Sequence, residues 1–176
     1  MQKTSIPALD LIFARRSVRV YAPGEVGDDV IQKLLEAAMA APSAAAADPW
    51  RFVVIRSREL LGKMAEALPF GRMISSAALG VVVCGDQQAS HDQQLSYLLQ
   101  DCSAATENLL LAAQALGLGA CWLGIHPRQQ RVESVSRLLS LPPGVIPVCC
   151  IAIGRPGEEK EARTRFNASH VHYEKW

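Results

Sequence analysis

Residues 92–116 constrain the fold of this chain more than any other segment. They form a run of about 25 residues without proline or glycine, and Gly117-Leu-Gly119 follows directly, a pattern typical of a long helix that ends at a glycine cap. The second half of the run, residues 104–116, is apolar on most of its circumference. Such a helix must be covered on nearly all sides. In a chain of 176 residues, we expect a second copy to supply part of that cover.

Predicted helices and strands alternate along the rest of the chain. Apolar periodicity and capping residues predict helices at residues 5–15, 28–41, 57–68 and 127–139. Apolar and β-branched runs predict strands at residues 51–56, 79–84, 120–125 and 145–153, with a short extended piece at 17–21. This order predicts a mixed α/β layer in which helices flank a mixed central sheet. The length favours one domain over residues 1–176.

A polar tail follows the last predicted strand, over residues 154–176. A free polar tail would fray. This tail carries apolar anchors, which are Phe166, Val171, Tyr173 and Trp176. We therefore expect a C-terminal arm that wraps the partner subunit of a homodimer.

Charge and composition exclude several classes of partner. Eighteen Lys and Arg residues against seventeen Asp and Glu residues leave a net charge of +1, so no overall field would attract nucleic acid or an anionic membrane. Apolar stretches are interrupted within about ten residues, too soon for a bilayer span of about 20 residues. The first sixteen residues lack the apolar core of a signal peptide. We expect neither a membrane nor a nucleic-acid partner.

The cysteines are predicted to be core residues. They are odd in number, without a C-x-x-C pair or histidines at metal-ligand spacing, and are Cys84, Cys102, Cys121, Cys149 and Cys150. Free thiols of this kind are typical of the reducing cytoplasm, where we expect the protein. His170-x-His172 stands in the polar tail, and we expect no metal site there.

Motifs for phosphate loops and for nucleophilic catalysis are missing. Gly117-Leu-Gly119 follows a helix and precedes a strand, which is the reverse of the order in a dinucleotide-binding fingerprint. Gly154-Arg-Pro-Gly157 lacks the Gly-Lys-Ser/Thr ending of a P-loop, and the chain has no G-x-S-x-G elbow. ATP chemistry and serine-type hydrolysis are therefore unsupported.

Three segments remain as candidates for binding a ligand. The alternation of Arg15, Ser17 and Arg19 in an extended stretch would place two guanidinium groups and a hydroxyl on one side. This arrangement suits a phosphate with a sugar-like chain. The alternative interpretation of these arginines is a solvated helix end. The small residues at 42–49 can approach a flat aromatic ligand or serve only as a connector. The strand end at 119–124 can offer backbone N–H groups to a ring edge or be an ordinary core strand.

Taken together, these segments resemble the nitroreductase family of FMN-dependent oxidoreductases. The resemblance covers nearly the whole chain and rests on R-R-S-V-R at 15–19, A-P-S-A at 41–44 with P-W at 49–50, the helix and strand at 100–124 ending in C-W-L-G, L-L-S-L-P-P-G at 138–144, and I-G-R-P at 153–156. It implies an α+β fold and an intimate homodimer with FMN at the interface. It also implies ping-pong transfer of electrons from NADH or NADPH to a small organic acceptor, such as a nitro compound or a quinone.

The resemblance also implies roles for individual residues. The phosphate and ribityl chain of FMN would be contacted by Arg15, Arg16 and Ser17, and the phosphate also by Arg163 and Arg165 from the tail. Arg19 would lie near the pyrimidine edge of the ring. The ring would be contacted from the other subunit by Pro42, Ser43 and Ala44, and its face and N5 edge by Trp122, Leu123 and Gly124. Hydride arrival at N5 leaves negative charge at the pyrimidine edge, which a fixed guanidinium stabilises. FMN carries this chemistry, so no catalytic acid or base is expected.

Two positions depart from the family pattern. Many relatives have Asn-x-Gln just before the Pro-Trp pair, where this chain has Ala46 and Asp48, and longer relatives have a lysine where this chain offers Arg72. These changes remove polar contacts to the ring or the substrate. Two alternatives therefore stay open: a flavin-binding protein with little turnover, and a specialised flavin-fragmenting or dehalogenating relative.

Overall fold

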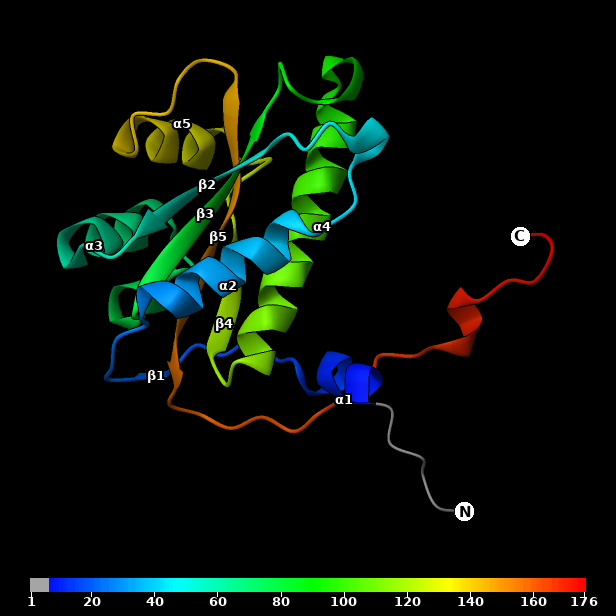
Figure 1. Cartoon of the computed structure of the whole chain (residues 1–176), viewed down its shortest axis with the longest axis horizontal. Coiled ribbons are helices and arrows are strands. Elements are labelled where there is room, and N and C mark those ends of the chain that lie inside the picture. Colours follow the sequence, from blue (N-terminus) through cyan, green and yellow to red (C-terminus); the bar gives the residue numbers. More distant parts are fainter. Residues whose placement is uncertain (1–6) are drawn as a thin grey trace.

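The computed structural model describes residues 7–176, and the predicted capping residue Ser5 lies outside this range. Its helices and strands follow in the order α1 (Pro7–Ala14), β1 (Tyr21–Ala22), α2 (Asp28–Met39), β2 (Trp50–Ile55), α3 (Arg58–Ala67), β3 (Leu79–Asp86), α4 (Leu95–Ala115), β4 (Gly119–Gly124), α5 (Gln129–Leu138) and β5 (Val145–Pro156). Short 3-10 turns occupy Ala44–Ala46, Arg72–Ser76, His91–Gln93 and Ala168–His170. The α+β fold class is confirmed (Figure 1).

The sheet is built around β5. This strand pairs with β3 along one edge and with β4 along the other, while β2 pairs with β3, and β1 pairs with the last residues of β5. All four ladders are antiparallel, and the parallel contact seen within residues 7–176 is the isolated bridge between Ser17 and Ala120. The sheet was predicted to be mixed, and its four ladders are in fact antiparallel. Strand direction depends on which strands meet in space, and an apolar run alone does not encode it.

Successive residues of β5 face two separate cores. Cys149, Ile151 and Ile153 pack with residues of α2 and α4 on one face of the sheet, whereas Cys150 and Ala152 pack with residues of α3 and α5 on the other (Figure 1). Helices on both faces explain why the strand is apolar without alternation. The five cysteines are free and buried, as predicted.

The long helix α4 begins three residues later than predicted. Asp92 and Gln93 have φ angles of 50° and 54°, which is the left-handed region that an α-helix excludes, so His91–Gln93 forms a separate 3-10 turn. The predicted C-cap is confirmed at Gly117, whose φ is 71°. The Leu118 N–H donates to the carbonyl of Ala113 across this cap.

The chain itself covers one side of α4. The residues buried on that side are Leu98, Asp101, Cys102, Ala105, Thr106, Leu109, Leu110 and Ala113. Leu95, Tyr97 and Leu116 of the helix and its cap stay more than a third exposed. Cover of this second side by another copy stays a prediction.

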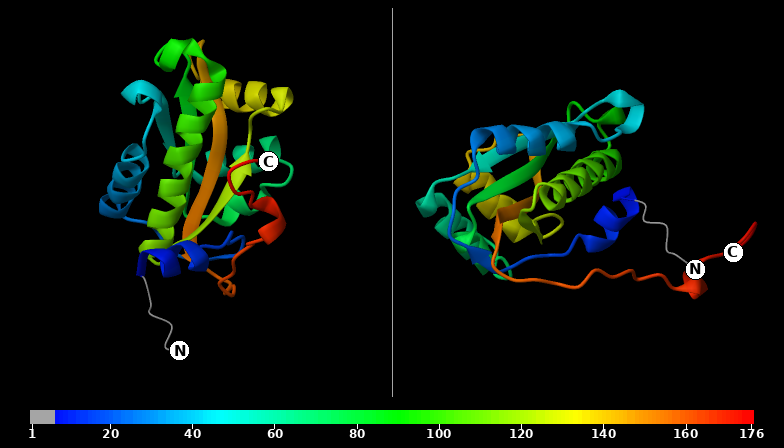
Figure 2. Two further views of the ribbon diagram at one scale, coloured as in Figure 1. Left: turned by 90° about the vertical axis from the view of Figure 1, so that its right-hand side faces the viewer. Right: turned by 60° about the horizontal axis from the view of Figure 1, so that its bottom comes forward.

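The tail leaves the body of the protein after β5 (Figures 1 and 2). β5 continues through Gly154 and Pro156, which pair with Gly119 and Tyr21, so the extended arm begins three residues later than predicted. The Arg163 N–H donates to the Phe13 carbonyl of α1 at 3.2 Å. Beyond this point Phe166, Tyr173 and Trp176 are 76%, 85% and 101% exposed, and Trp176 stacks on His172 within the tail, so these aromatic anchors are not buried against the body of their own chain.

Two further findings concern the part of the chain that the structure describes. None of its helices has both the length and the apolar character needed to cross a membrane. No group of three His, Cys, Asp or Glu side chains in it is arranged to hold a metal ion.

Candidate functional site

A hollow of about 370 Å³ lies against β4 and is called the β4 hollow below. Its lining comes from three places: the segment after α1, the connection between α3 and β3, and β4 with the start of α5. The lining residues are Arg19, Leu68, Phe70, Gly71, Met73, Cys121, Trp122, Leu123, Gly124 and Arg131. The structure thus brings Arg19 together with Trp122, Leu123 and Gly124. The volume is within the range of small-molecule sites.

β4 presents a free edge to this hollow. β5 pairs along one side of β4, and on the opposite side the Val18 N–H donates to the Ala120 carbonyl at 3.0 Å. Backbone groups alternate in direction along a strand, so those of Trp122 and Gly124 point to the same side as those of Ala120. A Cβ added at Gly124 would meet no atom within 4 Å. The strand end predicted to offer N–H groups to a ring edge therefore has open space beside it.

The arginine segment is divided between different surroundings. The Arg15 N–H still donates to the Leu11 carbonyl and so closes the last turn of α1, while its side chain lies 3.3 Å from the Glu107 carboxylate of α4. The Arg16 guanidinium donates to the carbonyl of Glu161 in the tail. Arg19 alone of the three lines the β4 hollow. Arg15 follows directly on α1 and is bonded to its last turn, so within a single chain its side chain and that of Arg19 do not share one surrounding as the predicted alternation required.

A carboxylate that sequence reasoning missed holds the extended stretch in place. One oxygen of Glu158 accepts the N–H groups of Arg19 at 2.6 Å and Val20 at 3.3 Å. Lys160 completes the arrangement, because its ammonium lies 2.9 Å from Glu158 and donates to the Ser17 carbonyl at 2.7 Å. The Arg19 N–H and the Lys160 side chain lower the pKa of Glu158. No sequence signal pointed to this contact, because Gly157-Glu-Glu-Lys160 matched no motif.

The second predicted segment forms a tightly held loop, residues 42–48. Ala45, Ala46 and Asp48 have φ angles of 52°, 53° and 47°, which non-glycine residues seldom adopt. The Ser43 hydroxyl donates to the Asp48 carboxylate at 2.5 Å and accepts the Asp48 N–H at 3.1 Å. Asp48, which stands where relatives have a glutamine, therefore closes its own loop.

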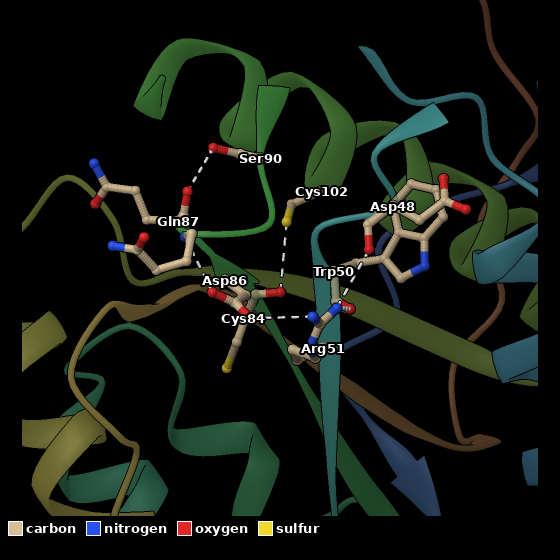
Figure 3. Close-up of polar contacts among 9 residues, drawn as sticks. Asp48, Trp50, Arg51, Cys84, Asp86, Gln87, Ser90 and Cys102 are labelled. Carbon is tan, nitrogen blue, oxygen red and sulfur yellow. Dashed lines mark hydrogen bonds and ion pairs between the residues drawn. The ribbon is translucent and has the colours of Figure 1, made fainter. Parts of the chain in front are cut away.

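Two neighbouring elements fix this loop from outside. At its exit, the Arg51 guanidinium donates to the carbonyls of Asp48 at 3.3 Å and Trp50 at 2.8 Å and pairs with Asp86 at 3.0 Å (Figure 3). At its entry, Asp101 of α4 accepts the Ala44 N–H at 2.9 Å. Asp101 is 5% exposed, and its second oxygen is buried without a hydrogen-bond partner.

Within residues 7–176 of a single chain, the loop and the β4 hollow stay separate. Pro42, Ser43 and Ala44 do not line the hollow, and they lie beside the first half of α4. Arg163 and Arg165 are exposed on the tail. Arg72 lines a different hollow with Glu66 and Pro69. The predicted contacts thus come together in one site only if a second chain contributes.

An antiparallel sheet between two helical layers defines the class, an α+β protein, and a hollow that contains Arg19 lies at the open edge of β4. The family model described as "Nitroreductase family" matches residues 12–70 and 68–155. The chain belongs to the nitroreductase family.

Individual relatives and solved structures agree with this membership. A protein of Archaeoglobus fulgidus named "Putative NADH dehydrogenase/NAD(P)H nitroreductase" is 46% identical over 171 residues, which cover 96% of this chain and 98% of that protein. A crystal structure of a Bacteroides thetaiotaomicron protein of the same name has a TM-score of 0.92 and 39% identity, covering 98% and 100% of the two chains. A Desulfovibrio desulfuricans nitroreductase solved in complex with FMN has a TM-score of 0.85 and 31% identity, covering 98% and 99%.

The residues present fit FMN. The β4 hollow combines apolar side chains with the guanidinium of Arg19, and the described lining contains no carboxylate. Backbone N–H groups on the open side of β4 suit the polar edge of a flavin ring, and the Gly124 carbonyl on that side already accepts a hydrogen bond from Arg131 at 2.9 Å. Arg15 and Arg16 precede this stretch at the end of α1, where they pair with Glu107 and the Glu161 carbonyl, and their guanidinium groups are of the kind that binds a phosphate.

Proposed function

We propose that this chain is an NAD(P)H-dependent oxidoreductase that uses FMN. The observation that carries the proposal is the β4 hollow, where Arg19, a free strand edge and the open space at Gly124 meet in a chain of the nitroreductase family. A relative crystallised with FMN supports the choice of cofactor. The names of other relatives, which give NADH and NAD(P)H, support the choice of electron donor.

FMN, when bound, supplies the hydride-accepting and electron-donating chemistry. In this proposal Arg15, Arg16 and Ser17 hold its phosphate and ribityl chain, and Arg163 and Arg165 close on the phosphate from the tail. Arg19 holds positive charge at the pyrimidine edge, where reduction adds negative charge. Trp122 and Leu123 bound the site on one side, and Gly124 leaves space for donor and acceptor in turn, which suits a ping-pong order.

We further propose that the working unit is a homodimer. Three observations support it: the exposed side of α4, the exposed aromatic side chains of the tail, and the separation of Pro42, Ser43 and Ala44 from the β4 hollow. A second chain can supply the loop that the hollow lacks. The acceptor is proposed to be a small organic molecule, a nitro compound or a quinone, and the five free, buried thiols favour a reducing cytoplasmic setting.

Adding FMN to the purified protein and removing the excess by gel filtration tests the cofactor. The spectrum of bound flavin is expected to persist, to bleach on anaerobic addition of NADH or NADPH, and to return when a quinone or nitro compound is added. A protein that takes up no FMN would reject the proposal. Bound FMN that neither nucleotide bleaches would favour the flavin-binding alternative.

A further inference from the structure

A pair of side chains at the β4 hollow has no role in the function proposed above. Arg131 of α5 and Phe70, between α3 and β3, both line the hollow, as does Gly124. The guanidinium carbon of Arg131 lies 5.8 Å from the centroid of the Phe70 ring, which is a cation–π distance. Phe70 is 84% exposed, so core packing does not explain an aromatic side chain at this position.

Arg131 is held at the hollow from two directions. One of its terminal nitrogens donates to the Gly124 carbonyl on the free edge of β4 at 2.9 Å, and the Phe70 ring faces the guanidinium. A guanidinium has five N–H donors, and this bond uses one of them. The group is thus oriented by the protein and keeps donors with which to bind a ligand.

The charges around the β4 hollow favour an anion. Among its described lining residues, Arg19 and Arg131 are cationic and none is acidic. In the proposed function Arg19 serves the cofactor, which leaves Arg131 as the cation for a second molecule. The apolar side chains of Leu68, Met73 and Trp122 suit a flat, conjugated ring beside it.

Arg131 also stands at a boundary between two hollows. Phe70 and Arg131 line a second space of about 450 Å³, to which Arg128 and Glu66 contribute as well. A molecule longer than one ring can therefore place its ring in the β4 hollow and extend past Arg131 toward Arg128.

We propose that Arg131, stacked on Phe70, is a specificity-determining residue that binds the anionic group of the planar molecule exchanging electrons at this site. Guanidinium groups bind carboxylates and phosphates through paired hydrogen bonds. That chemistry has two sources: the carboxylate of an aromatic acceptor and the diphosphate of the dinucleotide donor. This inference rests on the proposed function and adds the substrate class to it.

Isothermal titration of the FMN-loaded protein with two matched pairs of probes separates these sources. Benzoate is compared with the neutral benzamide, and ADP-ribose with the neutral adenosine. The Arg131→Gln variant is expected to bind benzoate or ADP-ribose at least about tenfold more weakly, with less than about a twofold change for the neutral probes. Loss of benzoate affinity identifies an acceptor carboxylate, and loss of ADP-ribose affinity identifies the donor diphosphate.

Two further variants keep the test decisive. Arg137→Gln removes the same charge from the exposed last turn of α5, outside both hollows, and is expected to behave like the parent. Phe70→Leu changes an exposed side chain, so folding should be retained. The affinity for the charged probe should fall about threefold. The proposal would be overturned if Arg131→Gln bound the charged and the neutral probes equally more weakly. It would also be overturned if Phe70→Leu and Arg131→Gln both left the probe affinities unchanged.

Failure of this inference differs from failure of the proposed function. A parent protein that takes up no FMN, or that NADH and NADPH do not bleach, counts against the proposed function. A parent that binds and bleaches normally, with an Arg131→Gln variant of unchanged probe affinities, rejects only the assignment of Arg131.

Discussion

Arg15 and Arg19 stand four positions apart in the sequence, yet they have different neighbours. Arg15 pairs with Glu107 at the end of α1, whereas Arg19 lines the β4 hollow with Trp122. The Glu158 carboxylate fixes the backbone of Arg19 and does not contact Arg15. If both arginines hold one FMN molecule, they act on its opposite ends, and their loss should have different consequences.

Replacing Arg15 with alanine removes charge-assisted hydrogen bonds to the phosphate, so FMN affinity should fall about 10- to 100-fold, equivalent to about 1.5–3 kcal/mol. The midpoint potential should hardly change. Arg19→Ala removes positive charge from the pyrimidine edge, so it should weaken the binding of reduced FMN more than the binding of oxidised FMN. The midpoint potential should therefore fall, by about 30 mV for each 1.4 kcal/mol of difference between the two losses of binding energy. Titration of both variants against a redox dye checks this. Equal potentials would show that Arg19 is not at the ring.

The buried thiols predict a loss of stability at high pH. Burial raises the pKa of Cys84, Cys102 and Cys149 to about 12, against about 8.5 for an exposed thiol. Above about pH 8.5 the unfolded chain therefore loses these protons while the folded protein keeps them. The free energy of unfolding should be steady below that pH and then fall toward pH 12, by up to about 1.4 kcal/mol per pH unit for each thiol.

Urea unfolding from pH 7 to 10.5 measures this effect. The matched control is Cys84→Ala, in which one of the three thiols is missing, so its stability should decline less steeply than that of the parent. All other ionisable groups are common to the parent and the variant, so the difference between their slopes isolates the thiol. Identical slopes would mean that the Cys84 thiol does not stay protonated in the fold.

The loop at residues 42–48 is an element held in an unfavourable backbone conformation by its neighbours. Ala45 has a φ of 52°, whereas Ala47, in the same loop, has an ordinary right-handed φ of −76°. A left-handed conformation costs an L-residue about 1–2 kcal/mol, and glycine avoids this cost. Asp101 and Arg51 anchor the two ends of the loop.

Glycine substitutions at these two alanines should therefore differ in effect. Ala45→Gly is expected to be about 1–2 kcal/mol more favourable for stability than Ala47→Gly, because both add the same freedom to the unfolded chain while the first also relieves the left-handed strain. Thermal unfolding of the two variants measures the difference. If Ala45→Gly were as destabilising as Ala47→Gly, the loop would not carry that strain.

Helices and strands were predictable from the sequence because apolar periodicity and capping act locally. Ser57 does cap α3, accepting the Leu60 N–H at 3.3 Å, and Gly117 does end α4. One error was local, since the left-handed Asp92 and Gln93 delay the start of α4, and others arose where a distant contact decides the structure. β5 extends to Pro156 because Tyr21 and Gly119 pair with its end. Glu158 and Asp101 became visible as supports of the candidate site only when the fold placed them beside Arg19 and Ala44.

At the scale of the whole molecule, the tail is the feature that a single chain does not explain. Phe166 and Trp176 are exposed, and the tail runs away from the sheet (Figure 2). One domain over residues 1–176 with an arm that wraps a partner stays a prediction. Obligate dimer interfaces bury about 2,000–5,000 Å², and an extended aromatic arm contributes readily to such an area.

Removing residues 166–176 should therefore weaken both the dimer and FMN retention, because the anchors of the arm are lost. Sedimentation equilibrium at micromolar concentration measures the first effect, and flavin content after gel filtration measures the second. The full chain is expected to sediment as a dimer, and the truncated chain should shift toward monomer. A truncated chain with full flavin content and unchanged sedimentation would reject the arm.

In the proposed dimer, two chains build each FMN site, one giving Arg15 and Arg19 and the other giving the loop at Ala44. Mixed dimers of two defective chains test this shared site. One chain carries Arg15→Ala with Arg19→Ala, the other carries Ala44→Trp, and each alone is expected to retain no FMN. Differently tagged and co-expressed, the two should form a dimer that retains one FMN, because one site then receives an intact half from each chain. A mixed dimer without FMN, or full FMN content in the Ala44→Trp protein alone, would contradict the shared site.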